Sequence, residues 1–172
     1  MKIGSLLILA VAAALTGCGA SSPASRDEVP GTKQEKKTAD FEKLSTLIES
    51  GNYQYTVRSA SPSGGRTLQI SSEYTLEARE GVYEAQLPYF GRAYSASYGG
   101  DGAIAFKGTP EDLQITRNER KSTLQVKFQI RGEGDDYKVS LEIGSSGFGS
   151  LVVSSQKRQS ISYYGQVSEL AP

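Results

Sequence analysis

The sequence predicts an all-β domain, an antiparallel meander that curls into a barrel, a half-barrel or a two-layer sheet, with one short helix before it. The strongest observation is the alternation of apolar and polar residues along 123–131 and again along 137–143. A period of two is typical of a strand with one buried face and one solvent-exposed face. Strands of that kind favour an antiparallel sheet, and a single helix cannot cover about nine of them. The sheet must therefore curl on itself.

The helix is expected over Asp40–Ser50, where apolar residues recur at spacings of three and four. Thr38 or Asp40 can cap its start, and Gly51 stands where a glycine commonly ends a helix. Its apolar stripe should pack against the sheet through Phe41, Leu44, Leu47 and Ile48.

The strands follow in order along the rest of the chain. The segments 123–131 and 137–143 are expected to form a hairpin joined by Gly132-Glu133-Gly134-Asp135. The expected inward residues are Leu124, Val126, Phe128 and Ile130 on the first strand, and Tyr137, Val139, Leu141 and Ile143 on the second. Further strands are expected at 53–57, at 68–78 with a break at Ser72, at 82–87 after Glu80-Gly81, and at 103–106, 113–117, 150–155 and 159–164.

The N-terminus carries a targeting signal. Lys2 precedes an apolar run over Ile3–Leu15, which is too short to span a membrane and ends in Leu15-Thr16-Gly17-Cys18. That spacing resembles the lipobox of bacterial lipoproteins. We therefore expect residues 1–17 to be a signal peptide, residues 18–39 to be the lipidated Cys18 and a flexible tether, and residues 40–172 to be one β-rich domain.

The first partner implied is thus a membrane, reached through Cys18. Gly19 replaces the aspartate that commonly retains lipoproteins in the inner membrane, and no acidic cluster follows Cys18 directly. We expect a protein anchored to the outer membrane, on its periplasmic face.

Composition excludes several classes of function. Lys plus Arg and Asp plus Glu number 19 each, so no net field favours nucleic acid. The chain has no histidine, and its single cysteine is the expected lipid site. Serine and cysteine hydrolase triads are therefore excluded, and we expect no metal, no cofactor and no enzymatic activity.

Weaker motifs have simpler explanations. Ser154-Ser155-Gln156-Lys157 matches the Ser-x-x-Lys pattern of penicillin-binding enzymes, but it follows a strand and lacks the partner motifs. The acid pairs Glu111-Asp112 and Asp135-Asp136 are expected to be solvated turn residues.

One segment breaks the alternation with proline, glycine and aromatic residues, at Leu87–Tyr94. Pro88 and Gly91 are expected to end a strand and turn a corner. Two interpretations stay open. In one, four residues form a ligand-binding rim: Tyr89, Phe90, Arg92 and Tyr94. In the other, the aromatic residues fill the core and Arg92 pairs with a carboxylate.

This segment, with Tyr98–Phe106 and Arg158–Gly165, resembles the uncharacterised lipoproteins of Bacteroidota that carry the domain of unknown function numbered 4251. The resemblance covers about residues 41–170. It implies a host group, membrane anchoring and a domain extent, and it carries no activity.

Three functions remain in competition. The first is a non-enzymatic domain that binds an apolar ligand in a curved sheet, or binds an envelope protein. The second is a structural or interaction subunit of an envelope assembly, with a filled core. The third is a hydrolase that uses carboxylates and tyrosine.

Overall fold

The helix starts earlier than its apolar pattern predicts. The computed structural model describes residues 32–92, 94, 103–132 and 134–170, and helix α1 spans Lys33–Glu49. Thr32 and Glu35 form a capping box, in which each side chain accepts a hydrogen bond from the other residue's backbone N–H. The start expected at Asp40 is therefore wrong, and residues 33–39 of the expected tether are helical. Apolar periodicity cannot detect these first turns, because residues 33–38 are polar or charged and residues 33–39 are all exposed.

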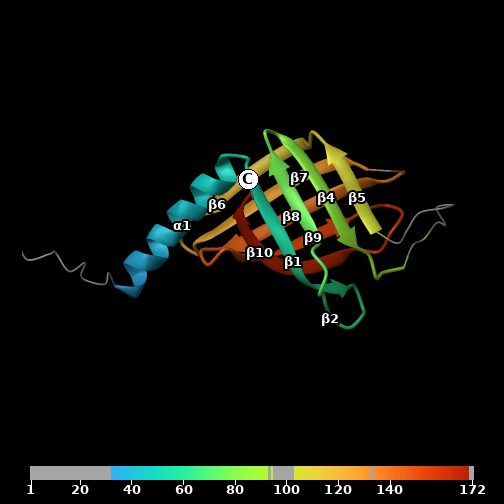
Figure 1. Ribbon diagram of the computed structural model, residues 1–172, viewed down its shortest axis with the longest axis horizontal. Helices are drawn as coiled ribbons and strands as arrows, with labels where there is room; N and C mark the ends of the chain where they lie inside the picture. The colour runs from blue at the N-terminus through green and yellow to red at the C-terminus, as the bar shows by residue number, and fades with distance from the viewer. Residues whose placement is uncertain (1–31, 93, 95–102, 133, 171–172) are drawn as a thin grey trace, which may run out of the picture. The chain divides into compact units, whose positions relative to one another are not determined.

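In the described residues, ten strands follow the helix and form one antiparallel sheet (Figure 1). The order across the sheet is β5-β4-β3-β1-β10-β9-β8-β7-β6, and the short β2 pairs with β1. The bounds are β1 Tyr53–Pro62, β2 Leu68–Gln69, β3 Thr75–Arg79, β4 Val82–Pro88, β5 Ala103–Gly108, β6 Glu111–Asn118, β7 Thr123–Arg131, β8 Asp136–Gly144, β9 Phe148–Ser154 and β10 Ile161–Glu169.

The predicted hairpin and its register are confirmed. Phe128 of β7 stands opposite Val139 of β8, and Val126 stands opposite Leu141. All eight residues expected to point inward on these strands are buried. The segment 68–78 forms two strands, β2 and β3, instead of one broken strand, and β10 extends to Glu169.

The sheet curls into a half-barrel, which confirms the predicted fold class. The edge strand β5 approaches the far side of the sheet, where Phe106 makes an isolated bridge to Gly132 just after β7. The other edge strand, β6, lies beyond that meeting point, and all eight of its residues are exposed. The curl brings two layers of strands face to face (Figure 1).

Aromatic side chains fill the space between the layers. Neighbouring rings have centroids 4.6–6.4 Å apart, and they form a continuous series of Tyr53, Tyr83, Phe128, Phe106 and Tyr137. These residues come from five different strands on both layers.

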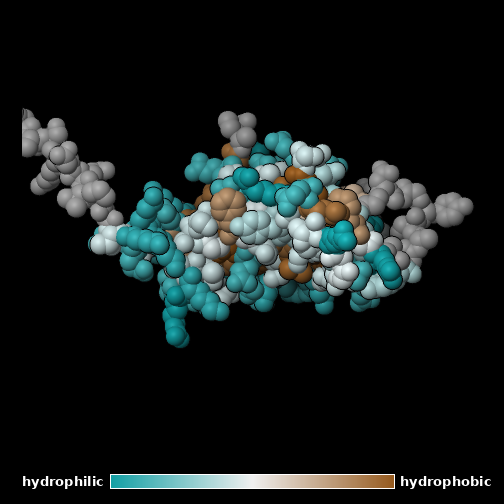
Figure 2. Space-filling view, turned by 90° about the horizontal axis from the view of Figure 1, so that it is seen from below, coloured by the Kyte–Doolittle hydropathy of each residue, from teal (hydrophilic) through white to brown (hydrophobic). Residues whose placement is uncertain are grey.

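Helix α1 packs on this core through Phe41, Leu44 and Ile48, all buried. The guanidinium of Arg117 on β6 lies over the Phe41 ring at 5.4 Å and pairs with Glu42 at 2.8 Å. The first turns of α1 project from the domain and expose a largely hydrophilic surface (Figure 2). Within the described residues, no helix has the length and apolar character needed to cross a membrane.

Candidate functional site

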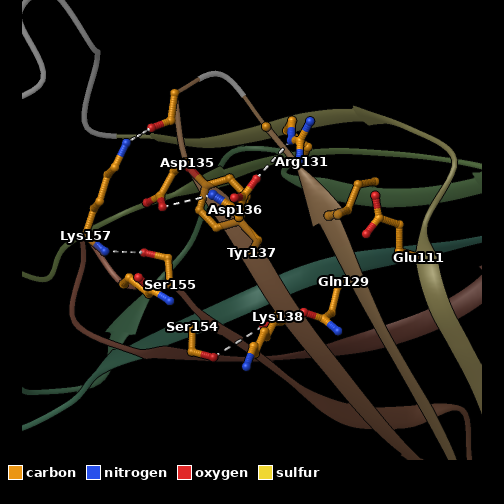
Figure 3. Close-up of a pocket in the computed structure, with 14 residues that line it drawn as sticks. Glu111, Gln129, Arg131, Asp135, Asp136, Tyr137, Lys138, Ser154, Ser155 and Lys157 are labelled. Atoms are coloured by element: carbon orange, nitrogen blue, oxygen red, sulfur yellow. Dashed lines mark hydrogen bonds and ion pairs between the residues drawn. The ribbon is translucent and has the colours of Figure 1, made fainter.

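The candidate site is a cleft at the end of the half-barrel where β7 and β8 turn. Its volume is about 830 Å³. The β7–β8 turn forms one wall, and the loop between β9 and β10 forms the other. Figure 3 shows Asp135 lying between Lys157 on one side and Asp136 and Tyr137 on the other. The lining residues are Glu111, Gln129–Gly132, Gly134–Lys138 and Ser154–Lys157.

Asp135 has the most unusual environment in the cleft. Its side chain is only 5% exposed. The Oδ1 atom accepts a hydrogen bond from the Asp136 backbone N–H at 3.0 Å, whereas the buried Oδ2 atom has no hydrogen-bond partner among the described residues. The expectation of a solvated acid is therefore wrong for Asp135, although Asp136 is exposed.

Arg158 is the charge that faces Asp135. Its Nε atom lies 3.9 Å from Asp135 Oδ2, which is an ion-pair distance but too long for a hydrogen bond. Two other contacts hold the guanidinium in place: Nη1 donates to the Ala103 carbonyl at 2.8 Å, and the group lies over the Tyr89 ring at 5.4 Å. Arg158 thus compensates part of the carboxylate charge and leaves Oδ2 without a donor.

The opposite wall is held by hydrogen bonds between side chains and backbone groups. Ser155 Oγ accepts hydrogen bonds from the backbone N–H groups of Lys157 and Arg158, at 3.3 and 3.1 Å. Lys157 Nζ donates to the Gly134 carbonyl across the cleft. The two walls are therefore connected, and the β9–β10 loop holds its position without regular secondary structure.

The charges of the lining are balanced. Among the described lining residues, three are acidic and three are basic. Arg131 and Asp136 pair at 3.3 Å. Lys138 and Glu111 form no ion pair with any described residue, so their charges remain free to meet a ligand.

Tyr137 supplies the floor of the cleft. Burial raises the pKa of its phenol, and the nearby Arg158 opposes that shift. Its ring packs so closely on Gly132 that a Cβ atom there would lie 2.6 Å from Tyr137 Cε2 and 2.6 Å from the Ala105 carbonyl oxygen. A glycine is therefore required where β5 meets the β7–β8 turn.

The family model described as a domain of unknown function, DUF4251, matches residues 35–167. The chain belongs to the DUF4251 family. A crystal structure of a DUF4251 family protein from Bacteroides eggerthii shares the fold, with a TM-score of 0.60 and 13% sequence identity, over 80% of this chain and 92% of that chain. The search of curated proteins found no match.

The predicted rim residues of this DUF4251 domain lie next to the cleft without lining it. Tyr89 is half-buried, and its hydroxyl lies within hydrogen-bonding distance of the carbonyls of Arg92 and Gln159, at 2.8 and 3.0 Å. Phe90 and Tyr94 are 46% and 71% exposed. The corner therefore has a packed residue, Tyr89, and an exposed aromatic pair, and its role in binding stays a prediction.

Other expectations concern residues outside the described part of the chain, namely Cys18 and the segment 98–102. Ser154 and Lys157 do line the cleft, but they bond to backbone carbonyls of Lys138 and Gly134 and not to each other. No group of three or more acidic, histidine or cysteine residues suited to a metal occurs in the described regions.

Proposed function

We propose that this DUF4251 protein is a lipid-anchored, non-enzymatic binding domain of the bacterial envelope, and that it takes a polar ligand in the cleft beside Asp135. The observation that carries this proposal is the buried Oδ2 atom of Asp135, which lacks a hydrogen-bond donor. A buried polar atom without a partner costs about 1–3 kcal/mol, and a charged one costs more. A ligand hydroxyl, amide or ammonium group would remove that cost.

Two features support a polar ligand on the outside of the sheet over an apolar ligand within it. The aromatic series from Tyr53 to Tyr137 occupies the interior. The walls of the cleft, in contrast, expose carboxylate, ammonium, amide and hydroxyl groups. Arg158 bonds to the Ala103 carbonyl and lies over the Tyr89 ring, and in this position its Nε atom is 3.9 Å from Asp135 Oδ2, too far for a hydrogen bond.

We propose no reaction for this cleft. The chain has no histidine to act as a base near neutral pH. Burial raises the pKa of the Tyr137 phenol, which makes it a poor general base. The groups present are suited to hydrogen bonding and charge compensation.

Replacement of Asp135 tests the binding site. The mature protein is screened by ligand-observed NMR against a panel of amines, amino acids, polyols and neutral sugars. We expect the compounds that bind the wild type to lose at least tenfold in affinity with Asp135→Ala, because the variant removes the free acceptor. Glu142→Ala, a substitution at an exposed position elsewhere on β8, should leave the affinity for these compounds unchanged. Thermal melts establish that both variants are folded. Binding by the same compounds to Asp135→Ala, or by no polar compound at all, contradicts the proposal.

Replacement of Cys18 tests the anchor. In the native host, Cys18→Ser should move the protein from the membrane fraction to the soluble fraction, because acyl chains contribute about 0.8 kcal/mol of membrane affinity per buried methylene. Mass spectrometry of the wild type should show an acylated N-terminal peptide that begins at Cys18. Ser21→Ala, three residues away, is the matched control. A wild-type protein that keeps residues 1–17, or that is found in the soluble fraction, would contradict the proposed lipid anchor.

A further inference from the structure

The Asp135 cleft continues into a second cleft on the outer face of the sheet. The second cleft has a volume of about 520 Å³ and lies over β7, β8 and β9, with Asp112 and Gln114 of β6 at its side. Gln129, Lys138 and Ser154 line both clefts. We call the combined surface the outer groove.

Strand pairing sets the direction of the outer groove. Gln129 stands opposite Lys138, and Lys138 stands opposite Ser154, so the three shared residues form one row across three strands. The next outward row, two residues further from the turn, is Lys127, Ser140 and Val152. Successive rows on one face are roughly 7 Å apart, and three strands span about 10 Å. The groove therefore starts at Asp135 and runs along the strands toward the middle of the sheet.

A β-bulge in β6 builds the side wall. Glu111 pairs with Gln129, but Gln114 pairs with Lys127, so β6 has one extra residue in this interval. Asp112 takes up the bulge with a φ angle of 52°, and its Oδ2 accepts a hydrogen bond from Gln129 Nε2 at 2.8 Å. Bulges redirect side chains at sheet edges. This one turns Asp112 toward the groove.

The chemistry of the groove favours an uncharged ligand. Its described lining includes four acidic residues and four basic ones, namely Glu111, Asp112, Asp135 and Asp136 with Lys127, Arg131, Lys138 and Lys157. A polyanion or a polycation would meet as many like charges as opposite ones. A chain of hydroxyl groups both donates and accepts, and it can satisfy carboxylate, ammonium and amide groups in turn.

The position of the groove disfavours a peptide. A peptide commonly binds a sheet by adding a strand to a free edge. The backbone groups of β8 already pair with β7 and β9, so this face offers hydrogen bonds from side chains only.

From these observations we infer that the outer groove binds an extended, neutral, hydroxyl-rich chain, that is, an oligosaccharide. One sugar unit donates a hydroxyl to Asp135 Oδ2, and the following units lie along the rows of Lys138 and Ser140. This inference rests on the proposed binding at Asp135 and adds the length and the chemical class of the ligand.

The experiment is a calorimetric titration of the full mature protein, in detergent, with neutral oligosaccharides of increasing length. The probes are malto-, cello- and chito-oligosaccharides of one to six units. In the series that binds, we expect Kd to fall at least tenfold from one unit to four. Ser140→Tyr places a ring in the second row and should remove this gain while the affinity for one unit is kept. Glu142→Tyr, the next outward position on β8 and outside the groove lining, is the matched control.

The inference is overturned if no oligosaccharide binds, if affinity does not depend on length, or if Ser140→Tyr leaves the gain in affinity intact. Tighter binding of oligogalacturonate or of an uncharged Gly-Ser hexapeptide also overturns it. If a short sugar or another polar compound binds through Asp135 and longer chains bind no more tightly, the proposed function is supported and only the extended binding along the outer groove is contradicted. Binding that is unchanged in Asp135→Ala would instead remove the proposed function.

Discussion

Leu141→Asp is expected to unfold the domain at room temperature. Leu141 is 1% exposed in the middle of β8, and it stands between Val126 and Leu151, which are also buried. The substitution removes buried apolar volume, at a cost of about 2–5 kcal/mol, and buries an unpaired charge, which costs several more. A domain of this size has about 5–15 kcal/mol of net stability, so little or none would remain.

Urea unfolding followed by far-ultraviolet circular dichroism measures this effect. Lys127→Asp is the control, because Lys127 is exposed on the opposite face of the same hairpin. Its free energy of unfolding should stay within about 0.5 kcal/mol of the wild type. If Lys127→Asp were the more damaging change, the inward and outward sets of residues would have to be exchanged.

Alkaline pH is expected to unfold the protein in one cooperative step. Five buried tyrosines have a pKa raised chiefly by burial: Tyr53, Tyr55, Tyr83, Tyr137 and Tyr163. Two of them donate hydrogen bonds that a phenolate cannot make. Tyr163 donates to the Pro88 carbonyl at 2.8 Å, and the Tyr55 hydroxyl lies 3.1 Å from the carbonyl oxygens of Gly149 and Tyr163.

Stability is expected to fall at high pH because the folded protein requires these phenols to be neutral. The unfolded chain ionises these phenols near pH 10, whereas the folded chain keeps them neutral to higher pH. The contribution of these neutral phenols to the free energy of unfolding is therefore fully present below about pH 10, and it is lost as the pH rises above that value. Each group whose pKa is strongly raised removes about 1.4 kcal/mol per pH unit. The three largest shifts, at Tyr53, Tyr55 and Tyr163, together remove about 4 kcal/mol per unit, which is a large part of the net stability.

Tyrosinate absorbance and circular dichroism, recorded through one alkaline titration, give the measurement. The ionisation of the five buried tyrosines should coincide with the loss of β structure between about pH 10 and 12. Tyr163→Phe should make the loss of stability with pH shallower by about 1.4 kcal/mol per unit. Complete ionisation of all tyrosines at a pH where the circular dichroism is still native would disprove the expectation.

The strands and their inward faces could be predicted from the sequence because the direction of a side chain on a strand is a local property. The alternation along 124–130 and 137–143 is enough to place the apolar residues of these two segments on the inner face. The start of α1 cannot be predicted in this way, because it depends on the polar pair Thr32 and Glu35, which an apolar pattern does not reveal.

The closure of the sheet and the candidate site depend on contacts between residues far apart in the chain. The sequence alone leaves a barrel, a half-barrel and a two-layer sheet open. The strand order decides for the half-barrel, because β5 and β6 remain edge strands and an isolated bridge, rather than a ladder, joins Phe106 to Gly132. Asp135 stands in a Gly-rich turn and has the local features of a solvated acid. It is nevertheless buried and lies beside Arg158, which the loop after β9 brings to it and which Ala103 and Tyr89 hold in place. Local sequence thus determined which residues face the core, whereas the curl of the sheet decided which polar residues became buried, because the solvent exposure of a turn depends on what packs over it.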